Sequence, residues 1–178
     1  MKTQELKRDL LVWMGTLLEY PKEDQESVLP GVVIERLFPH EQATVYLREF
    51  FAHIDAMGLG ARQEHYVRTF DVIPLCSLYL SVHLFGEESF KRSELMTGFK
   101  AIYDKHPSVE ITELPDHLGV VLEHNDWFEQ EEWQDLVEMC ILPALPKMID
   151  KLEQTRNPYA FVLKAIRVLL LDKEMLHA

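Results

Sequence analysis

The residues that could do chemistry gather at one junction, where the segment 113–118, Glu-Leu-Pro-Asp-His-Leu, opens directly into an apolar run. Pro115 fixes its own φ and favours an extended Leu114, so we expect a new helix to start at Asp116 or His117. A carboxylate there is favoured by the helix dipole and can accept a backbone N–H, which leaves His117 able to point away from the core. A capped turn without any function accounts for these residues equally well.

Three histidines suggest metal binding as a second kind of chemistry. His83, His117 and His124 could act in a small metal-dependent hydrolase, with Glu123 and Asp126 close by in sequence. On one helix, His117 and His124 would lie two turns apart, which is ~10.5 Å along the axis. That separation is too large for both to bind one ion at a distance of about 2 Å. We therefore expect no metal site, and the hydrolase is kept as an alternative.

Common catalytic signatures are absent from the sequence. There is no Gly-x-Gly-x-x-Gly, no Gly-x-x-x-x-Gly-Lys-Ser/Thr and no Gly-x-Ser-x-Gly. The usual nucleotide-binding and acyl-transfer sites thus have no support, and no catalytic nucleophile can be named. We expect neither an enzyme nor a bound cofactor.

The elements that must position these residues are helices, because apolar residues recur at helical spacing between prolines and glycines. We expect helices over residues 3–20 and 32–38, from Pro39 to Gly58, from Ala61 to Gly86 with a break near Pro74, and from Phe90 to His106. The next helix runs from the junction to Cys140 with a pause at Asn125, and Pro143 and Pro146 should kink its continuation. The last helix runs from Pro158 to Leu170, with Asn157 as its cap. No sustained alternation with a period of two is present. The predicted class is all-α, a single compact bundle of roughly eight helices that covers residues 1–178 as one domain.

Composition and charge narrow the function classes. The 178 residues are 47% hydrophobic and carry a formal net charge of -12, which disfavours nucleic-acid binding and is typical of a soluble protein or one with a basic partner. Cys76 and Cys140 lie separately in apolar sequence, as reduced core thiols would. Without a signal-peptide pattern or an apolar run of about 18 residues, we expect a cytoplasmic protein that does not insert into a membrane.

A groove that receives a peptide helix is a further possibility, since it needs apolar and aromatic side chains flanked by charges opposite to those of the ligand. The candidates are Tyr66, Phe70, Asp71, His83, Leu114, Asp116, His117 and Glu123. Each could also have a purely structural role: core packing for Phe70 and Leu114, capping for Asp71, and a hydrogen-bonded core histidine for His83. The acidic run over 123–135 is usually a solvated face, but it would also attract a basic peptide.

Three features of the chain resemble the TorD/DmsD/NarJ family of molybdoenzyme assembly chaperones, and within it the NarJ-type chaperones of respiratory nitrate reductase. They are Leu17-Leu18-Glu19-Tyr20-Pro21 at the end of the first helix, Tyr66-Val67-Arg68-Thr69-Phe70-Asp71 before a helix with His83-Leu84-Phe85-Gly86-Glu87, and Glu113-Leu114-Pro115-Asp116-His117-Leu118 before Leu122-Glu123. The NarJ-type pattern usually continues with an aromatic residue, where this chain has His124.

This resemblance implies an all-helical cytoplasmic chaperone without catalytic turnover. Such a protein binds the N-terminal segment of a molybdenum oxidoreductase catalytic subunit, often a twin-arginine signal peptide or its remnant, until the cofactor is inserted and the subunits assemble. The expected client is the catalytic subunit of nitrate reductase or of a close relative, with molybdenum cofactor delivery proteins as further partners. The expected contacts are Tyr66, Phe70 and Leu114 as apolar groups, Asp71, Asp116 and Glu123 as charge partners, and His117 as an orienting or pH-sensitive group. A generic helical adaptor that dimerises through its apolar faces is the other alternative.

Overall fold

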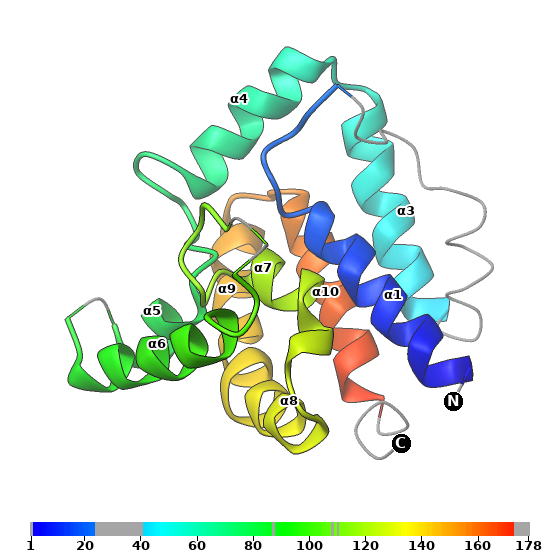
Figure 1. Ribbon diagram of the computed structural model, residues 1–178. Coiled ribbons are helices and arrows are strands. Elements are labelled where there is room, and N and C mark those ends of the chain that lie inside the picture. The colour runs from blue at the N-terminus through cyan, green and yellow to red at the C-terminus, as the bar shows by residue number, and fades with distance from the viewer. Residues whose placement is uncertain (1, 24–40, 87, 108, 110, 173–178) are drawn as a thin grey trace.

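The computed structural model describes residues 2–23, 41–86, 88–107, 109 and 111–172. The short helix expected over 32–38 lies outside these residues. The observed elements are α1 (Lys2–Thr16), α3 (Glu41–Asp55), α4 (Leu59–Phe70), α5 (Leu80–Phe85), α6 (Phe90–Tyr103), α7 (Leu118–Glu123), the 3-10 helix η1 (Asn125–Trp127), α8 (Gln130–Leu136), the π-helix η2 (Val137–Ile141), α9 (Leu142–Gln154) and α10 (Tyr159–Leu171) (Figure 1). The described part of the chain contains no strand beyond one isolated antiparallel bridge, so the predicted all-α class is confirmed.

Helix α10 is the centre of the core, and it packs against α3, α9 and α1. Its inward stripe includes Val162, Leu163 and Ile166, which are fully buried. Burying a side chain of this size contributes roughly 1.5–3 kcal/mol to stability. The Asn157 carboxamide accepts the backbone N–H of Tyr159 at 3.0 Å, so the predicted cap forms and the helix starts one residue later than expected. Buried residues from the other helices join one hydrophobic cluster around α10, although the single-domain organisation stays a prediction.

The helical path from α8 to α9 is continuous, as expected, and it contains one stretch of π-helix. The π-helix η2, over Val137–Ile141, precedes Pro143 and Pro146 in α9. Each proline removes a donor and crowds the carbonyl one turn earlier, and a wider turn relieves that crowding. The irregularity that the prolines predict is therefore observed as a π-helix, while the kink itself stays a prediction.

The segment between α4 and α5 corrects the prediction, which resumed the helix at Leu75 directly after Pro74. Residues 71–79 are not helical, and Val72 has a φ of 53°, a left-handed conformation that a β-branched residue rarely adopts. The N–H of Leu118 donates to the Leu78 carbonyl at 2.9 Å, and the Leu80 N–H donates to the Asp116 carbonyl at 3.0 Å. These bonds hold residues 78–80 against the start of α7, and residues 71–76 before them are mostly bends, so the helix is interrupted over nine residues.

Helices α1 and α7 approach each other closely because each has a glycine at the contact. A Cβ placed on Gly15 would lie 2.9 Å from the Gly119 carbonyl oxygen, and one placed on Gly119 would lie 3.1 Å from Cε1 of His117. The first distance is shorter than real Cβ atoms show, and the second is tight enough that the His117 ring would have to shift. The close approach brings the C-terminal end of α1 beside Glu123 on α7.

Candidate functional site

A pocket of about 640 Å³ opens where the segment after α1, helix α4, the segment before α5, the loop over 111–113 and helix α7 meet. Its wall contains aromatic rings from Tyr20, Tyr66, Phe70 and Tyr79 and acids from Glu19, Asp71, Glu113 and Glu123. Lys22 is the basic residue that lines it, and His117 and His124 complete the polar side. The expected recess beside the proline-bounded junction is thus present.

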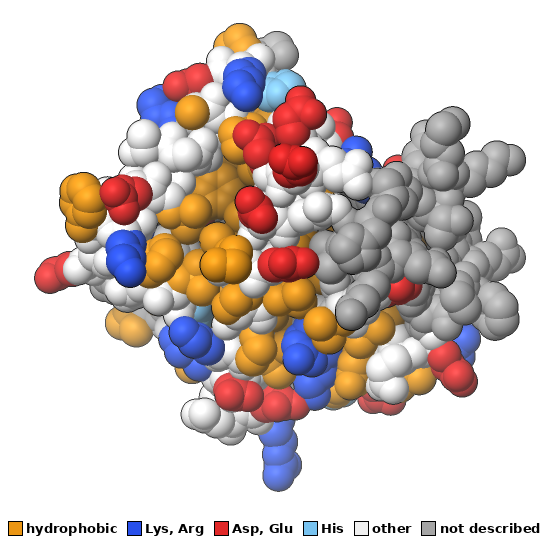
Figure 2. Space-filling model, turned by 90° about the horizontal axis from the view of Figure 1, so that it is seen from below, with side chains coloured by type: hydrophobic (Ala, Val, Ile, Leu, Met, Phe, Trp, Pro, Cys, Tyr) orange, Lys and Arg blue, Asp and Glu red, His pale blue; other side chains and the backbone are white. Residues whose placement is uncertain are grey.

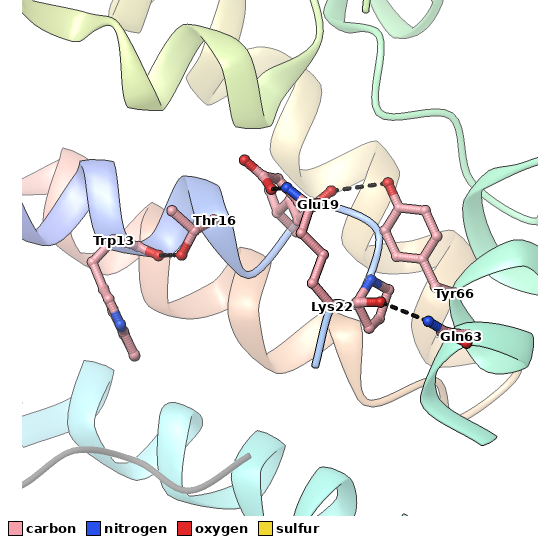
Figure 3. Close-up of polar contacts among 8 residues, drawn as sticks. Trp13, Thr16, Glu19, Lys22, Gln63 and Tyr66 are labelled. Atoms are coloured by element: carbon pink, nitrogen blue, oxygen red, sulfur yellow. Dashed lines mark hydrogen bonds and ion pairs between the residues drawn. The ribbon is translucent and has the colours of Figure 1, made fainter. Parts of the chain in front are cut away.

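Helix α4 holds the segment after α1 in place, which puts Glu19 on the pocket wall (Figure 3). The Tyr66 hydroxyl donates to the Leu18 carbonyl at 3.0 Å, and the Gln63 amide donates to the Pro21 carbonyl at 3.0 Å. Burial, together with the carboxylates of Glu113 and Asp71, raises the pKa of Tyr66. Its hydroxyl therefore stays protonated and keeps donating this bond.

Glu19 and Glu123 face each other across the junction of α1 and α7. Burial raises the pKa of Glu123 to about 7, and repulsion from Glu19 and a hydrogen bond with its carboxyl group act in the same direction. The Lys22 ammonium donates to Glu19 Oε2 at 2.9 Å and opposes this effect. Near neutral pH the Glu123 carboxyl therefore loses its proton easily, and a cation placed between the two groups would favour that loss.

The opposite wall combines an acid with aromatic rings. The Tyr79 hydroxyl donates to Glu113 Oε2 at 2.8 Å, and the Tyr79 ring packs edge-on against His117 at 5.6 Å between centroids. Burial, with this bond to Glu113, raises the pKa of Tyr79 to about 12. The rings of Tyr66 and Phe70 pack edge-to-face at 5.2 Å. Acids beside aromatic faces suit a Lys or Arg side chain with apolar neighbours.

Residues 39–162 match the family model described as the nitrate reductase delta subunit, and they supply every wall of this pocket except the part from the segment after α1. The chain belongs to this family. It is 30% identical over 155 residues to the nitrate reductase molybdenum cofactor assembly chaperone NarJ of Escherichia coli K12, covering 84% of this chain and 64% of that protein. The chain thus spans less than two thirds of the length of that relative.

A second relative is similar over more of its own length. The probable nitrate reductase molybdenum cofactor assembly chaperone NarJ of Bacillus subtilis 168 is 28% identical over 156 residues, covering 86% of this chain and 83% of that protein. The NarJ-type resemblance of the sequence is confirmed by these matches.

In this member of the delta-subunit family, the predicted site residues divide into two groups. Those that line the pocket are Tyr66, Phe70, Asp71, His117 and Glu123. The structure does not bring His83, Leu114 or Asp116 into the pocket wall. Whether the lining residues contact a peptide stays a prediction.

His83 has the structural role of a hydrogen-bonded core histidine. It is buried, one ring nitrogen lies 2.7 Å from the Ser77 carbonyl oxygen, and burial lowers the pKa of the ring. Leu114 is exposed beside the pocket without lining it. Within the part of the chain that the structure describes, no three His, Cys, Asp or Glu side chains are placed to hold a metal ion. The hydrolase alternative therefore gains no support from His83, His117 and His124.

Asp116 is fully buried, and its role differs from the predicted cap of its own helix. Its Oδ2 accepts the backbone N–H of Ser81 at 3.0 Å and also the Ser81 hydroxyl. The carboxylate therefore caps the first turn of α5, a helix that lies earlier in the sequence. Arg92 of α6 donates to the same hydroxyl at 2.9 Å. Asp116 connects the junction with α5 and α6 and lies behind the pocket wall.

The sequence leaves His117 able to point away from the core, but the structure buries it. Only 5% of the residue is exposed, although it lines the pocket. Burial lowers the pKa of the ring, against the opposing effect of Glu113, Asp116 and Glu19. Among the described residues, its Nδ1 finds no hydrogen-bond partner.

Sequence reasoning did not assign several residues of the pocket, chiefly Glu19, Tyr79 and Glu113. Glu19 and Glu113 lie in the segments 17–21 and 113–118, which carry the family resemblance, so a signal for them was present. Tyr79 had no such signal, because its segment was expected to be helical.

The described helices include none with both the length and the hydrophobicity that crossing a bilayer requires.

Proposed function

We propose that this protein is an assembly chaperone for a molybdenum oxidoreductase, and that nitrate reductase is the client enzyme. The NarJ relatives carry that function in their names. The observation that supports a binding role here is the pocket in which four acids and four aromatic rings meet. In this proposal the chaperone binds the N-terminal segment of the catalytic subunit there and performs no catalysis.

The proposed ligand is a short segment with basic side chains beside an apolar helix, such as a twin-arginine signal peptide or its remnant. A guanidinium group would replace the Lys22 ammonium beside Glu19 and pair with Glu123, while Glu113 and Asp71 receive a second basic group. Hydrogen bonds to charged groups contribute about 1.5–3 kcal/mol each. The rings of Phe70 and Tyr79 would cover the apolar part of the segment.

Holding this segment has a direct use in assembly. A catalytic subunit that has not received its cofactor must not be exported or join its partners early. A chaperone that covers the N-terminal segment delays export and subunit assembly until the cofactor is inserted. Reversible electrostatic binding fits this task, because it is fast and does not require a permanent interface.

The test is calorimetric titration of the full chain with a synthetic peptide of the first 15 or so residues of the nitrate reductase catalytic subunit. We expect saturable binding that weakens as NaCl rises from 50 to 500 mM, since salt screens exposed charges. The double variant Glu19→Gln with Asp71→Asn should weaken binding about tenfold or more, which is ~1.4 kcal/mol.

The matched control is Glu138→Gln, which removes an exposed acid of η2 outside the pocket. It should bind the peptide as the unaltered chain does. Absence of any heat or spectroscopic change with the peptide would refute the proposed function. Equal weakening in the control would show that only net charge matters and that the pocket is not the site.

A further inference from the structure

A second recess lies on the lower side of the molecule, between α6 and the continuous helix formed by α8 and η2. It has a volume of about 520 Å³, and its surface is mostly apolar. Seen from below, this face has a hydrophobic area in its middle with charged side chains around it (Figure 2). None of the described residues that line this α6–α8 groove also lines the pocket. The groove is therefore a separate feature of the surface.

Helix α6 forms one wall of the groove, and this wall is lowest at a glycine. Leu95, Gly98 and Ile102 lie on one face of the helix at spacings of three and four residues. A Cβ placed on Gly98 would meet no atom within 4 Å, so the space above this glycine is open. Another backbone can approach closely at such a position.

The π-helix forms the other wall. Met139 of η2 lines the groove although 71% of it is exposed, and Cys140 beside it is half-buried. π-helical turns are rare and are found frequently at functional sites. Methionine is common on surfaces that bind partner helices, because its flexible side chain adapts to different shapes. Pro143 and Pro146 account for the π-helix itself, but core packing does not account for the exposed side chain of Met139 beside an open groove.

Charges on the rim indicate the chemistry of the occupant. Glu94 of α6 and Glu132 and Asp135 of α8 lie along the groove, against one base, Lys105. The chain as a whole has a net charge of -12, so a second copy would bring further negative charge to an acidic rim. A basic partner would be attracted instead.

We infer that the α6–α8 groove binds an amphipathic helix of a partner protein, with an apolar face in the groove and Lys or Arg residues along its flanks. The stretch from Glu94 to Lys105 is ~17 Å long, which accommodates about three turns of a guest helix. Recognition of this kind places apolar side chains at i, i+3, i+4 and i+7 into the groove. Binding in the groove is independent of the proposed function, and both sites can be occupied at once.

The two cysteines of the chain provide the readout. Cys140 lines the groove, whereas Cys76 is completely buried, so a maleimide reagent reports on Cys140. The probe is a synthetic 14-residue helical peptide with leucines at i, i+3, i+4 and i+7 and lysines on both flanks. At ten times its Kd, it should slow modification of Cys140 about tenfold. A peptide of the same composition, scrambled to remove the apolar face, should not.

Variants test whether the peptide lies in the groove itself. Met139→Glu and Asp135→Lys should each abolish the protection, measured as the ratio of rates with and without the peptide. The control is Ile73→Glu, since Ile73 is 87% exposed and lines neither recess, and it should keep the protection. Protection that survives Met139→Glu would overturn the inference.

Three more outcomes decide against it. Equal protection by the scrambled peptide would show unspecific binding. Protection of Cys140 by raising the protein concentration, with a dimer in sedimentation, would assign the groove to a second copy of the chain. Loss of Cys140 protection in Glu19→Gln would place the probe peptide in the pocket instead of the groove. If the client peptide fails to bind, the proposed function is refuted, but the groove result is unaffected.

Discussion

Replacing Glu123 by Gln should make the protein more stable at pH 8 and unchanged in stability at pH 4.5. The reason is the raised pKa of this carboxyl group in the native state, about 7 against 4.5 for the ordinary group. Between these pH values the native state binds more protons than the unfolded state, so stability falls as pH rises. The full stability is present below pH 4.5 and is lost as pH passes through about 7.

The size of the effect follows from the same values. A pKa raised from 4.5 to about 7 corresponds to ~3 kcal/mol at ~1.4 kcal/mol per pH unit. Glu123 is only half-buried, and water screens part of its interaction with Glu19. We therefore expect a stabilisation of ~1–2 kcal/mol in Glu123→Gln at pH 8.

Urea denaturation followed by circular dichroism at pH 4.5, 6, 7 and 8 measures this difference directly. Glu138→Gln is the control, because it makes the same chemical change on an exposed helix face. The same Glu123→Gln protein should bind the client peptide about three- to tenfold more weakly at pH 8, having lost a negative charge of the pocket. A difference in stability that does not vary between pH 4.5 and 8 would refute the reasoning.

Four further substitutions test the structure. Gly119→Ala should destabilise the protein by ~1–3 kcal/mol because its Cβ meets α1 and His117, whereas Gly98→Ala, with open space around it, should stabilise by ~0.5–1 kcal/mol; thermal unfolding compares the two. Asp116→Ala should cost roughly 2–4 kcal/mol in urea denaturation, since it removes a buried cap of α5, and a variant of full stability with weak client binding would assign the residue to the site instead. Tyr66→Phe should cost ~1–2 kcal/mol in the same assay by leaving the Leu18 carbonyl without its donor, and no change would show that this bond does not hold the pocket wall.

Helical periodicity was sufficient to predict the class of the fold, because the spacing of apolar residues within a helix is a local property. Helix α10 is the clearest case, where the Asn157 cap and the stripe through Leu163 and Ile166 are all readable from adjacent residues. The segment 71–79 was not predictable in this way. Leu75 and Leu78 keep helical spacing there, but backbone pairing with the start of α7 decides the conformation.

The same distinction applies to the site. The sequence pointed to Tyr66, Phe70 and Glu123, since they lie in recognisable segments, and the structure brings them to one pocket. The partner of Asp116 is 35 residues away on α5, and no local pattern indicates that pairing. The pairing of Glu19 with Glu123 depends on a contact between two helices, which also lies beyond local patterns.

The glycine contact between α1 and α7 determines how the pocket responds to sequence change. A Cβ at Gly15 would come within 2.9 Å of the Gly119 carbonyl oxygen, so no layer of side chains is available there to absorb a shift between these helices. The spacing between the end of α1 and helix α7 is therefore a property of the backbone. If the proposed function holds, substitutions on the pocket wall would change which client peptide binds best, while the width of the opening stays the same.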